Sequence, residues 1–302
     1  MRKPAPLTAT VSATCGALLM LTSCGTQQAN GGTSSTASPA CGAEPIGDPS
    51  ELKRDGVEIT GVGGGAGACA QFEVTNEGTE PLTYTVTLTF LSPSGEALAN
   101  PKETVRSVKP GAKVRRTVAA SDLTADVTGG AARVRILQVR SVPTTEEPRT
   151  GGACPPSGVR LYADQGDAAM GLRVVGLRLE NCGTRDYPLN GYPEVQLLGE
   201  DHAPVTGVRV LDGNAGIATG TGADAPPTPL TLTPGARAHA TLVWRNTTEA
   251  GQDPVHAPYA RIHAKPGTAP VTVTPEFDLG TTGKLGVGPW QLLDEGEGRA
   301  RP

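Results

Sequence analysis

The sequence has few aromatic residues and no run of basic residues, and both shortages limit what the protein does. Phenylalanine, tryptophan and tyrosine together make up 3% of the 302 residues. This scarcity argues against a surface that stacks sugars or nucleobases. The formal net charge is −4, and the lysines and arginines form no long run along the chain. We therefore expect no nucleic-acid partner.

Long apolar runs and recognisable catalytic motifs are also missing. The apolar stretch from Leu7 to Met20 is too short and too polar to form a stable membrane span. There is no Gly-x-Ser-x-Gly elbow, zinc-binding helix motif or calcium loop. Three histidines, His239, His256 and His263, lack the close spacing of metal ligands. The sequence therefore predicts no metal, no cofactor and no enzymatic activity.

An N-terminal export signal is the clearest feature that the sequence does contain. Arg2 and Lys3 precede the apolar stretch, which ends in Leu21-Thr22-Ser23-Cys24. This order resembles the lipobox of bacterial lipoproteins. The resemblance implies that residues 1–23 are a cleaved signal peptide and that Cys24 receives a diacylglycerol. The expected location is the outer face of the cell membrane, with the lipid as anchor. The alternative is an ordinary secretory signal with an incidental cysteine.

The remaining chain divides by composition into a tether, two domains and a tail. Residues 24–40 are nearly all small or polar, which is typical of a flexible tether. A stretch rich in proline, glycine and charge, residues 144–153, separates an N-terminal domain (41–143) from a C-terminal domain (154–292). Residues 293–302 are expected to be a disordered tail. Because the connecting stretch lacks apolar anchors, we expect each domain to fold on its own.

Both domains have the patterns of short β-strands. In YTVTLTF, residues 84–90, large apolar side chains alternate with threonines, which we expect on the solvent face. Similar short runs recur between turn sequences through both halves of the chain. This spacing predicts an all-β fold of two immunoglobulin-like β-sandwich domains.

The two halves also resemble each other. VTNEGTEP (74–81) is similar to LENCGTRD (179–186), since each is a strand end running into Asn-x-Gly-Thr. VKPGAKV (108–114) is similar to LTPGARA (232–238), and each opens a later strand. We interpret the two domains as a repeat, and the alternative is chance similarity between turn-rich sequences.

The second copy carries an insertion, residues 212–229. It is either part of a binding rim, because loops on rigid sandwiches often carry function, or a disordered excursion rich in glycine, alanine and threonine. Asp212, Asn214 and Tyr192 are the weak candidates for that rim.

The cysteines that follow Cys24 are interpreted as structural. Four cysteines allow three pairings, and pairing within each predicted domain gives Cys41–Cys69 and Cys154–Cys182. Cys182 lies in a predicted turn, Asn-Cys-Gly-Thr, with no histidine nearby to activate a nucleophilic thiol. Disulfides are expected in an export compartment. The alternative is a reactive loop around Cys182.

Residues 154 to about 290 resemble a domain of unknown function found on actinobacterial secreted lipoproteins. The motif is an apolar strand, Asn-x-Gly-Thr at 181–184, and then Gly-Tyr-Pro at 191–193. Many members of the family have a cysteine shortly before Gly-Tyr-Pro, whereas Tyr187 stands there in this sequence, which leaves the disulfide partner open. The resemblance implies a location and a fold but no chemistry.

The function that these patterns favour is a membrane-anchored, extracytoplasmic lipoprotein. It would serve as a non-enzymatic binding or structural module of the cell envelope, with an unidentified envelope protein or ligand as its partner. One alternative is a solute-binding component that delivers ligand to a transporter, but the usual βαβ pattern is absent. The other is an envelope hydrolase whose site has no recognisable motif.

Overall fold

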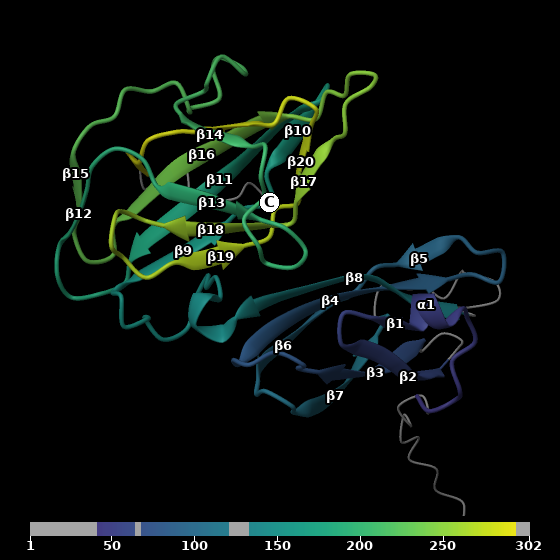
Figure 1. Cartoon of the computed structure of the whole chain (residues 1–302). Coiled ribbons are helices and arrows are strands. Elements are labelled where there is room, and N and C mark those ends of the chain that lie inside the picture. The colour runs from purple at the N-terminus through teal and green to yellow at the C-terminus, as the bar shows by residue number, and fades with distance from the viewer. Residues whose placement is uncertain (1–40, 64–67, 121–132, 294–302) are drawn as a thin grey trace, which may run out of the picture. The chain divides into compact units, whose positions relative to one another are not determined.

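The computed structural model describes residues 41–63, 68–120 and 133–293 (Figure 1). The predicted signal peptide, Cys24, the tether and nearly all of the predicted tail lie outside the described residues. The fold is nearly all β, as predicted, and we call the two parts the N-terminal lobe (41–143) and the C-terminal lobe (154–293). Among the residues described, no helix is long and apolar enough to cross a membrane.

The N-terminal lobe is a two-sheet sandwich. Its elements are α1 (Pro49–Leu52), β1 (Lys53–Arg54), β2 (Val57–Gly63), β3 (Cys69–Thr75), β4 (Leu82–Leu91), β5 (Ala97–Ala99), β6 (Lys102–Val108), β7 (Lys113–Ala119) and β8 (Arg133–Pro143). One sheet has the order β1-β2-β3-β7, and in the other β4 pairs with β5, β6 and β8. Phe72 and Val74 of the first sheet share one buried core with Val86 and Phe90 of the second.

The prediction that the threonines of β4 face solvent is wrong for Thr87 and Thr89. Both side chains are buried, as is Thr83. Neighbouring segments cover this face of β4, since the Thr83 hydroxyl lies within hydrogen-bond distance of Thr144 and Glu147 and Thr89 contacts Asn100. The hydroxyl of Thr89 donates to Asn100 Oδ1 at 2.8 Å, which satisfies its hydrogen-bonding need inside the fold.

The C-terminal lobe contains the remaining strands. They are β9 (Val159–Ala163), β10 (Asp167–Ala169), β11 (Leu172–Asn181), β12 (Tyr187–Leu189), β13 (Glu194–Leu198), β14 (Arg209–Asp212), β15 (Leu230–Leu232), β16 (Arg237–Arg245), β17 (Val255–Ala257), β18 (Tyr259–His263), β19 (Val271–Val273), β20 (Phe277–Gly280), β21 (Lys284–Val287) and β22 (Gln291–Leu292). The main sheet has the order β10-β11-β16-β21-β14, with β9 also on β11 and β22 on β16. A second sheet has the order β13-β18-β19. Leu177 and Trp244 of the main sheet share one core with Leu197 and Ile262 of the second.

The predicted repeat is present in the strand pairing of the two lobes. In the N-terminal lobe β3 lies between β2 and β7, and in the C-terminal lobe β11 lies between β9 and β16. The last strand of each trio follows a Pro-Gly turn. In the opposite sheets β4 pairs with β8, and β13 pairs with β18.

In the N-terminal copy, one buried asparagine connects the strand end to the distant turn. Asn76 Nδ2 donates to the carbonyl oxygens of Glu80 at 2.8 Å and Val108 at 2.7 Å. Its Oδ1 accepts from the backbone N–H of Gly78 at 2.8 Å, and its carbonyl accepts from Gly111 N at 2.8 Å. The side chain is fully buried.

The C-terminal copy has the same arrangement. Asn181 Nδ2 donates to the carbonyls of Arg185 at 2.8 Å and Leu232 at 2.7 Å, and Oδ1 accepts from Gly183 N at 3.1 Å. Its carbonyl accepts from Gly235 N at 2.7 Å. Each Asn-x-Gly-Thr turn is therefore fastened to its Pro-Gly turn by one asparagine.

Each lobe also has its own cysteine pair, in the pairing that the sequence predicted. The Cα atoms of Cys41 and Cys69 are 5.8 Å apart, and those of Cys154 and Cys182 are 5.6 Å apart. Both separations lie in the range of disulfide bonds. The staples close loops of equal length, since each pair is 28 residues apart in sequence.

The segment that joins the lobes buries more than its composition suggests. It contains the 3₁₀ helix η1 (Thr144–Glu146), and the side chains of Glu146 and Glu147 are buried. Glu146 accepts hydrogen bonds from Arg261 and, at 2.7 Å, from Thr272. The described residues of both lobes and of the segment between them belong to one compact unit. The domain boundaries given in the sequence analysis and the independent folding of the lobes stay predictions.

Candidate functional site

A concave site that combines several charged side chains lies in the C-terminal lobe, on the hairpin of β10 and β11. It is a cavity of about 290 Å³ between this hairpin, β16, β17 and the segment that leads into β20. Its charged or titratable lining side chains are Asp167, Arg173, His256, Glu276 and Asp278. Its apolar lining comes from Ala168, Val175, Trp244 and Pro275. A pocket with an apolar wall and a few convergent polar groups is the usual form of a small-ligand site.

Asp278 is the most heavily hydrogen-bonded carboxylate of the cavity. Its Oδ1 accepts from Trp244 Nε1 at 2.8 Å. Its Oδ2 accepts from Asn246 Nδ2 at 3.0 Å and from Arg173 Nη2 at 3.2 Å. The Trp244 ring is buried and packs on Phe277, with the ring centroids 4.8 Å apart. These contacts fix the carboxylate before any ligand arrives, which is what a preorganised binding group requires.

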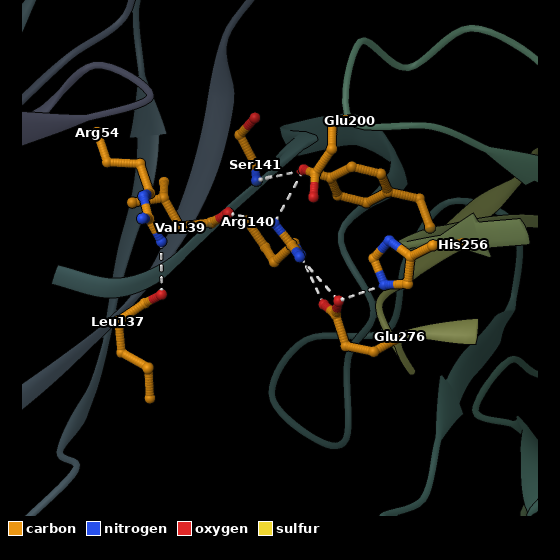
Figure 2. Close-up of polar contacts among 9 residues, drawn as sticks. Arg54, Leu137, Val139, Arg140, Ser141, Glu200, His256 and Glu276 are labelled. Atoms are coloured by element: carbon orange, nitrogen blue, oxygen red, sulfur yellow. Dashed lines mark hydrogen bonds and ion pairs between the residues drawn. The ribbon is translucent and has the colours of Figure 1, made fainter. Parts of the chain in front are cut away.

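Glu276 connects the cavity to the N-terminal lobe, as Figure 2 shows. Arg140, on β8, donates from Nε to Glu276 Oε1 at 2.6 Å and from Nη2 to Oε2 at 2.7 Å. Its Nη1 donates to Glu200 Oε2 at 3.0 Å, and His256 Nε2 lies 3.4 Å from Glu276 Oε2. Burial opposes the charge on Arg140, but the hydrogen bonds that it donates to Glu276 and the nearby Glu200 carboxylate leave its pKa raised.

The backbone at Glu276 is also unusual. Its φ is +59°, the left-handed region that residues other than glycine rarely adopt. Such a conformation has an energetic cost and persists where surrounding contacts determine it, often at functional sites. The bidentate contact with Arg140, whose side chain is 10% exposed, is one contact that holds Glu276 in place.

The contact between the lobes continues beside Arg140. The backbone N–H of Ser141 donates to the Tyr259 hydroxyl at 3.3 Å, and Val142, Leu198 and Tyr259 form a small buried cluster. The ring of His202 meets Tyr259 edge-on at 4.4 Å. Burial lowers the pKa of His202 and raises that of Tyr259. The junction therefore combines an ion-paired group with a small apolar cluster.

Arg140→Ala is expected to loosen this junction and to lower the free energy of unfolding by about 1–2 kcal/mol, because it removes a bidentate pair whose glutamate is partly exposed. Limited proteolysis should then cut the connecting segment, 144–153, faster than in the wild type. Arg115→Ala is the matched control, since Arg115 pairs only within the N-terminal lobe and its side chain is 77% exposed. Equal proteolysis rates in all three proteins would contradict the role assigned to Arg140.

The candidate rim residues do not line this cavity. Asp212 is exposed at the end of β14, and Asn214 Oδ1 accepts from Gly216 N at 3.0 Å. Tyr192 is half-buried in the turn after β12. No hydrogen bond joins Tyr192 to Asp212 or Asn214 among the residues described, so their common rim stays a prediction.

The insertion 212–229 is not a loose excursion. Ala223 is fully buried, and the carbonyl of Gly222 accepts from Gln291 Nε2 at 2.9 Å. The carbonyl of Ile217 accepts from Arg245 Nε at 3.2 Å. The insertion is therefore packed against the lobe by both apolar and polar contacts.

The histidines and one aspartate have local structural contacts. His263 Nδ1 lies 2.6 Å from the carbonyl oxygen of Thr268, and His256 contacts Glu276. Within the part of the chain that the structure describes, no group of three or more His, Cys, Asp or Glu is placed to hold a metal. Asp164 is a structural carboxylate, because it accepts hydrogen bonds from two backbone N–H groups and from Arg178.

Of the charged or titratable residues that line the cavity, the sequence analysis named only His256, and it considered that residue as a metal ligand. Arg173 and Trp244 are a cross-strand pair, since they lie opposite each other in the β11–β16 register. Asp278 lies more than thirty residues further along the chain. The one available signal was Trp244 itself, one of two tryptophans in the sequence. An indole N–H that is buried in a strand needs an acceptor.

Comparison with known proteins places the cavity within a recognised family domain. Residues 154–291 match the family described as "Domain of unknown function (DUF4232)". This finding agrees with the resemblance noted in the sequence, and the matched range includes β9 to β22 apart from the last residue of β22. No curated protein sequence matches the chain.

Proposed function

We propose that this protein is a lipid-anchored extracytoplasmic lipoprotein that acts as a non-enzymatic binding module of the cell envelope. The predicted anchor is a diacylglycerol on Cys24, and the predicted binding element is the C-terminal lobe. The immunoglobulin-like character of both lobes is part of the same proposal. The partner is an envelope component that the cavity of the C-terminal lobe recognises.

The observation that carries this proposal is the arrangement of the cysteines. All four cysteines after residue 40 lie in two pairs at disulfide distance, one pair in each lobe. Disulfides persist in oxidising compartments and are rare in the cytosol. The pairing therefore supports export, and the Leu21-Thr22-Ser23-Cys24 sequence supports lipid attachment after export.

The polar groups of the cavity support binding rather than catalysis. Glu276 and Asp278 each accept hydrogen bonds from an arginine side chain, so neither is presented as an unpaired general base. Cys182 is paired with Cys154 and so offers no thiol nucleophile.

Cys24→Ser is expected to abolish membrane anchoring, because the hydroxyl of serine does not replace the thiol that receives the lipid. The wild type should partition into the detergent phase of Triton X-114, whereas the variant should be released or retained as an unprocessed precursor. Globomycin, which blocks lipoprotein signal cleavage, should enlarge the wild type on a gel. Two acyl chains are needed for stable anchoring, so the expected difference is nearly complete.

Cys15→Ser is the matched control and should behave as the wild type, since Cys15 lies inside the predicted signal peptide. A Cys24→Ser protein that still partitions into detergent with wild-type mass would rule out lipid attachment at this residue.

A further inference from the structure

The cavity of the C-terminal lobe has an excess of negative charge among its lining side chains. Three carboxylates, those of Asp167, Glu276 and Asp278, face one lining arginine, Arg173. Arg140 neutralises Glu276 from the N-terminal lobe but is not a lining residue. The three carboxylates and the two arginines, Arg173 and Arg140, together carry a formal charge of −1 when His256 is counted as neutral. A cation is therefore the ligand charge that the cavity favours.

Two of the lining carboxylates can accept further hydrogen bonds. Asp167 is exposed and makes no ion pair with any residue that the structure describes. Asp278 accepts three hydrogen bonds, whereas an ionised carboxylate has about four acceptor positions. Its side chain is 41% exposed, so the remaining position is open to a ligand. A donor with several N–H groups matches this pair of acceptors.

The rest of the lining is apolar and suits an aliphatic chain. Ala168, Val175 and Pro275 supply carbon surface next to the carboxylates, and Trp244 closes the wall. The volume of about 290 Å³ compares with the roughly 30 Å³ that one water occupies in the liquid. The cavity therefore has room for a group about the size of a long amino-acid side chain.

We propose that this cavity binds an alkylguanidinium or alkylammonium group. The aliphatic chain lies against Ala168 and Val175, and the cationic head donates hydrogen bonds to Asp167 and Asp278. The proposal rests on the binding function proposed above and names the chemical class of its ligand. The cationic group belongs either to a free small molecule or to the side chain of a partner protein.

Met170, which is near the cavity in sequence, offers a way to distinguish a free small molecule from a partner side chain. Met170, at the tip of the β10–β11 hairpin, is 100% exposed and has a φ of +47°. Asparagine and glycine suit such hairpin positions, and a methionine there makes no contribution to the core. A large partner seated on the cavity would contact this side chain, whereas a free small molecule would not need it.

The test is an NMR titration of the whole chain in non-ionic detergent, labelled with ¹⁵N at tryptophan. The Trp244 indole N–H bonds Asp278 and reports on the cavity. The Trp290 indole N–H bonds the carbonyl of Ala264 inside the core and is the internal control. The probes are n-butylguanidinium, its neutral analogue n-butylurea and the anion pentanoate.

Butylguanidinium should move the Trp244 signal saturably, with a Kd in the roughly millimolar range for so small a ligand, while the Trp290 signal stays fixed. Butylurea and pentanoate should bind more weakly. Asp167→Asn should weaken butylguanidinium about threefold, the size of an exposed ion-pair contribution. Glu194→Gln, an exposed carboxylate on β13 away from the cavity, should leave the Kd unchanged.

The same titration with an acetylated Gly-Arg-Gly amide identifies the source of the cation. A partner side chain is indicated if this peptide binds more tightly than butylguanidinium and Met170→Asn weakens only the peptide. A free molecule is indicated if both bind equally and the Met170 variant has no effect. Preference for pentanoate or butylurea, or an unmoved Trp244 signal with every probe, overturns the proposal. None of these results alters the outcome of the Cys24→Ser experiment, so the two proposals fail separately.

Discussion

Replacing Asn181 by aspartate is expected to destabilise the C-terminal lobe by about 4 kcal/mol or more at neutral pH. The Asn181 amide is 1% exposed and donates to the carbonyls of Arg185 and Leu232. A carboxylate cannot donate, so the variant would lose both of these hydrogen bonds and would place a negative charge beside the two carbonyl oxygens. An orphaned buried acceptor costs about 1–3 kcal/mol, and an unpaired buried charge costs more.

The pH dependence of this variant follows from the same geometry. Burial and the two carbonyl oxygens both disfavour the charged form, so they raise the pKa of the new carboxyl above its value in the unfolded chain. The unfolded state therefore releases the proton first as the pH rises. Relative to the wild type, the variant is most stable below about pH 4, the ordinary pKa of aspartate, and this relative stability falls as the pH rises through the raised pKa. The neutral carboxyl has one O–H donor and so restores one of the two hydrogen bonds.

Urea denaturation of Asn181→Asp at pH 7 and at pH 4.5, compared with the wild type at each pH, measures both effects. Asn190→Asp is the matched control, because Asn190 is exposed in the following turn and its substitution should change stability by less than about 0.5 kcal/mol. Asn76→Asp, the equivalent variant of the N-terminal lobe, should lower the free energy of unfolding of that lobe by a similar amount. If Asn181→Asp proves no more harmful than Asn190→Asp, the asparagine does not hold the two turns together.

The sequence predicted the strands and the repeat but not the role of the repeated asparagine. Asn-x-Gly-Thr indicates a turn, because asparagine and glycine tolerate turn conformations and asparagine closes local hydrogen bonds. The local bonds to Gly78 and Gly183 agree with that interpretation. The decisive acceptors, the carbonyls of Val108 and Leu232, lie 32 and 51 residues further along the chain. Burial against such distant groups depends on how the sheets pack, and local propensity does not encode it.

The solvent-facing threonines were a wrong prediction for a related reason. Alternation in β4 correctly identified which side chains enter the main core, including Val86 and Phe90. The opposite face of an edge or outer strand is normally exposed, and period-two patterning assumes that arrangement. Thr89 is buried because the chain covers that face, and its contact with Asn100 is visible only in the folded protein.

The candidate site could not be predicted from the sequence, because its residues lie far apart along the chain. The cavity combines residues from Gln165 to Asp278, which belong to five separate segments. Arg140 and Glu276 meet across 136 residues. No motif spans these positions, since each segment contributes only one or two polar side chains. The cysteine pairs were predictable because the number of pairings is small and each predicted domain held two cysteines.

Removing the C-terminal staple by the double substitution Cys154→Ala and Cys182→Ala is expected to lower stability by about 3.5 kcal/mol. The bond closes a loop whose ends are 28 residues apart, and the chain-entropy estimate for such a loop gives this value. The double variant avoids the free thiol that a single substitution would leave. The loss should appear in the unfolding of the C-terminal lobe and leave that of the N-terminal lobe unchanged, because the staples lie in separate cores.

Peptide mapping of the native protein without reduction should link Cys182 to Cys154 and Cys41 to Cys69. Iodoacetamide should leave all four unmodified in the native protein. The matched variant, Cys41→Ala with Cys69→Ala, should shift the loss to the N-terminal lobe, since both loops have the same length. A Cys182 thiol that is alkylated quickly in the native protein, and whose removal leaves the melting temperature unchanged, would refute the structural role. The loop around Cys182 would then have to be treated as a redox or nucleophilic site.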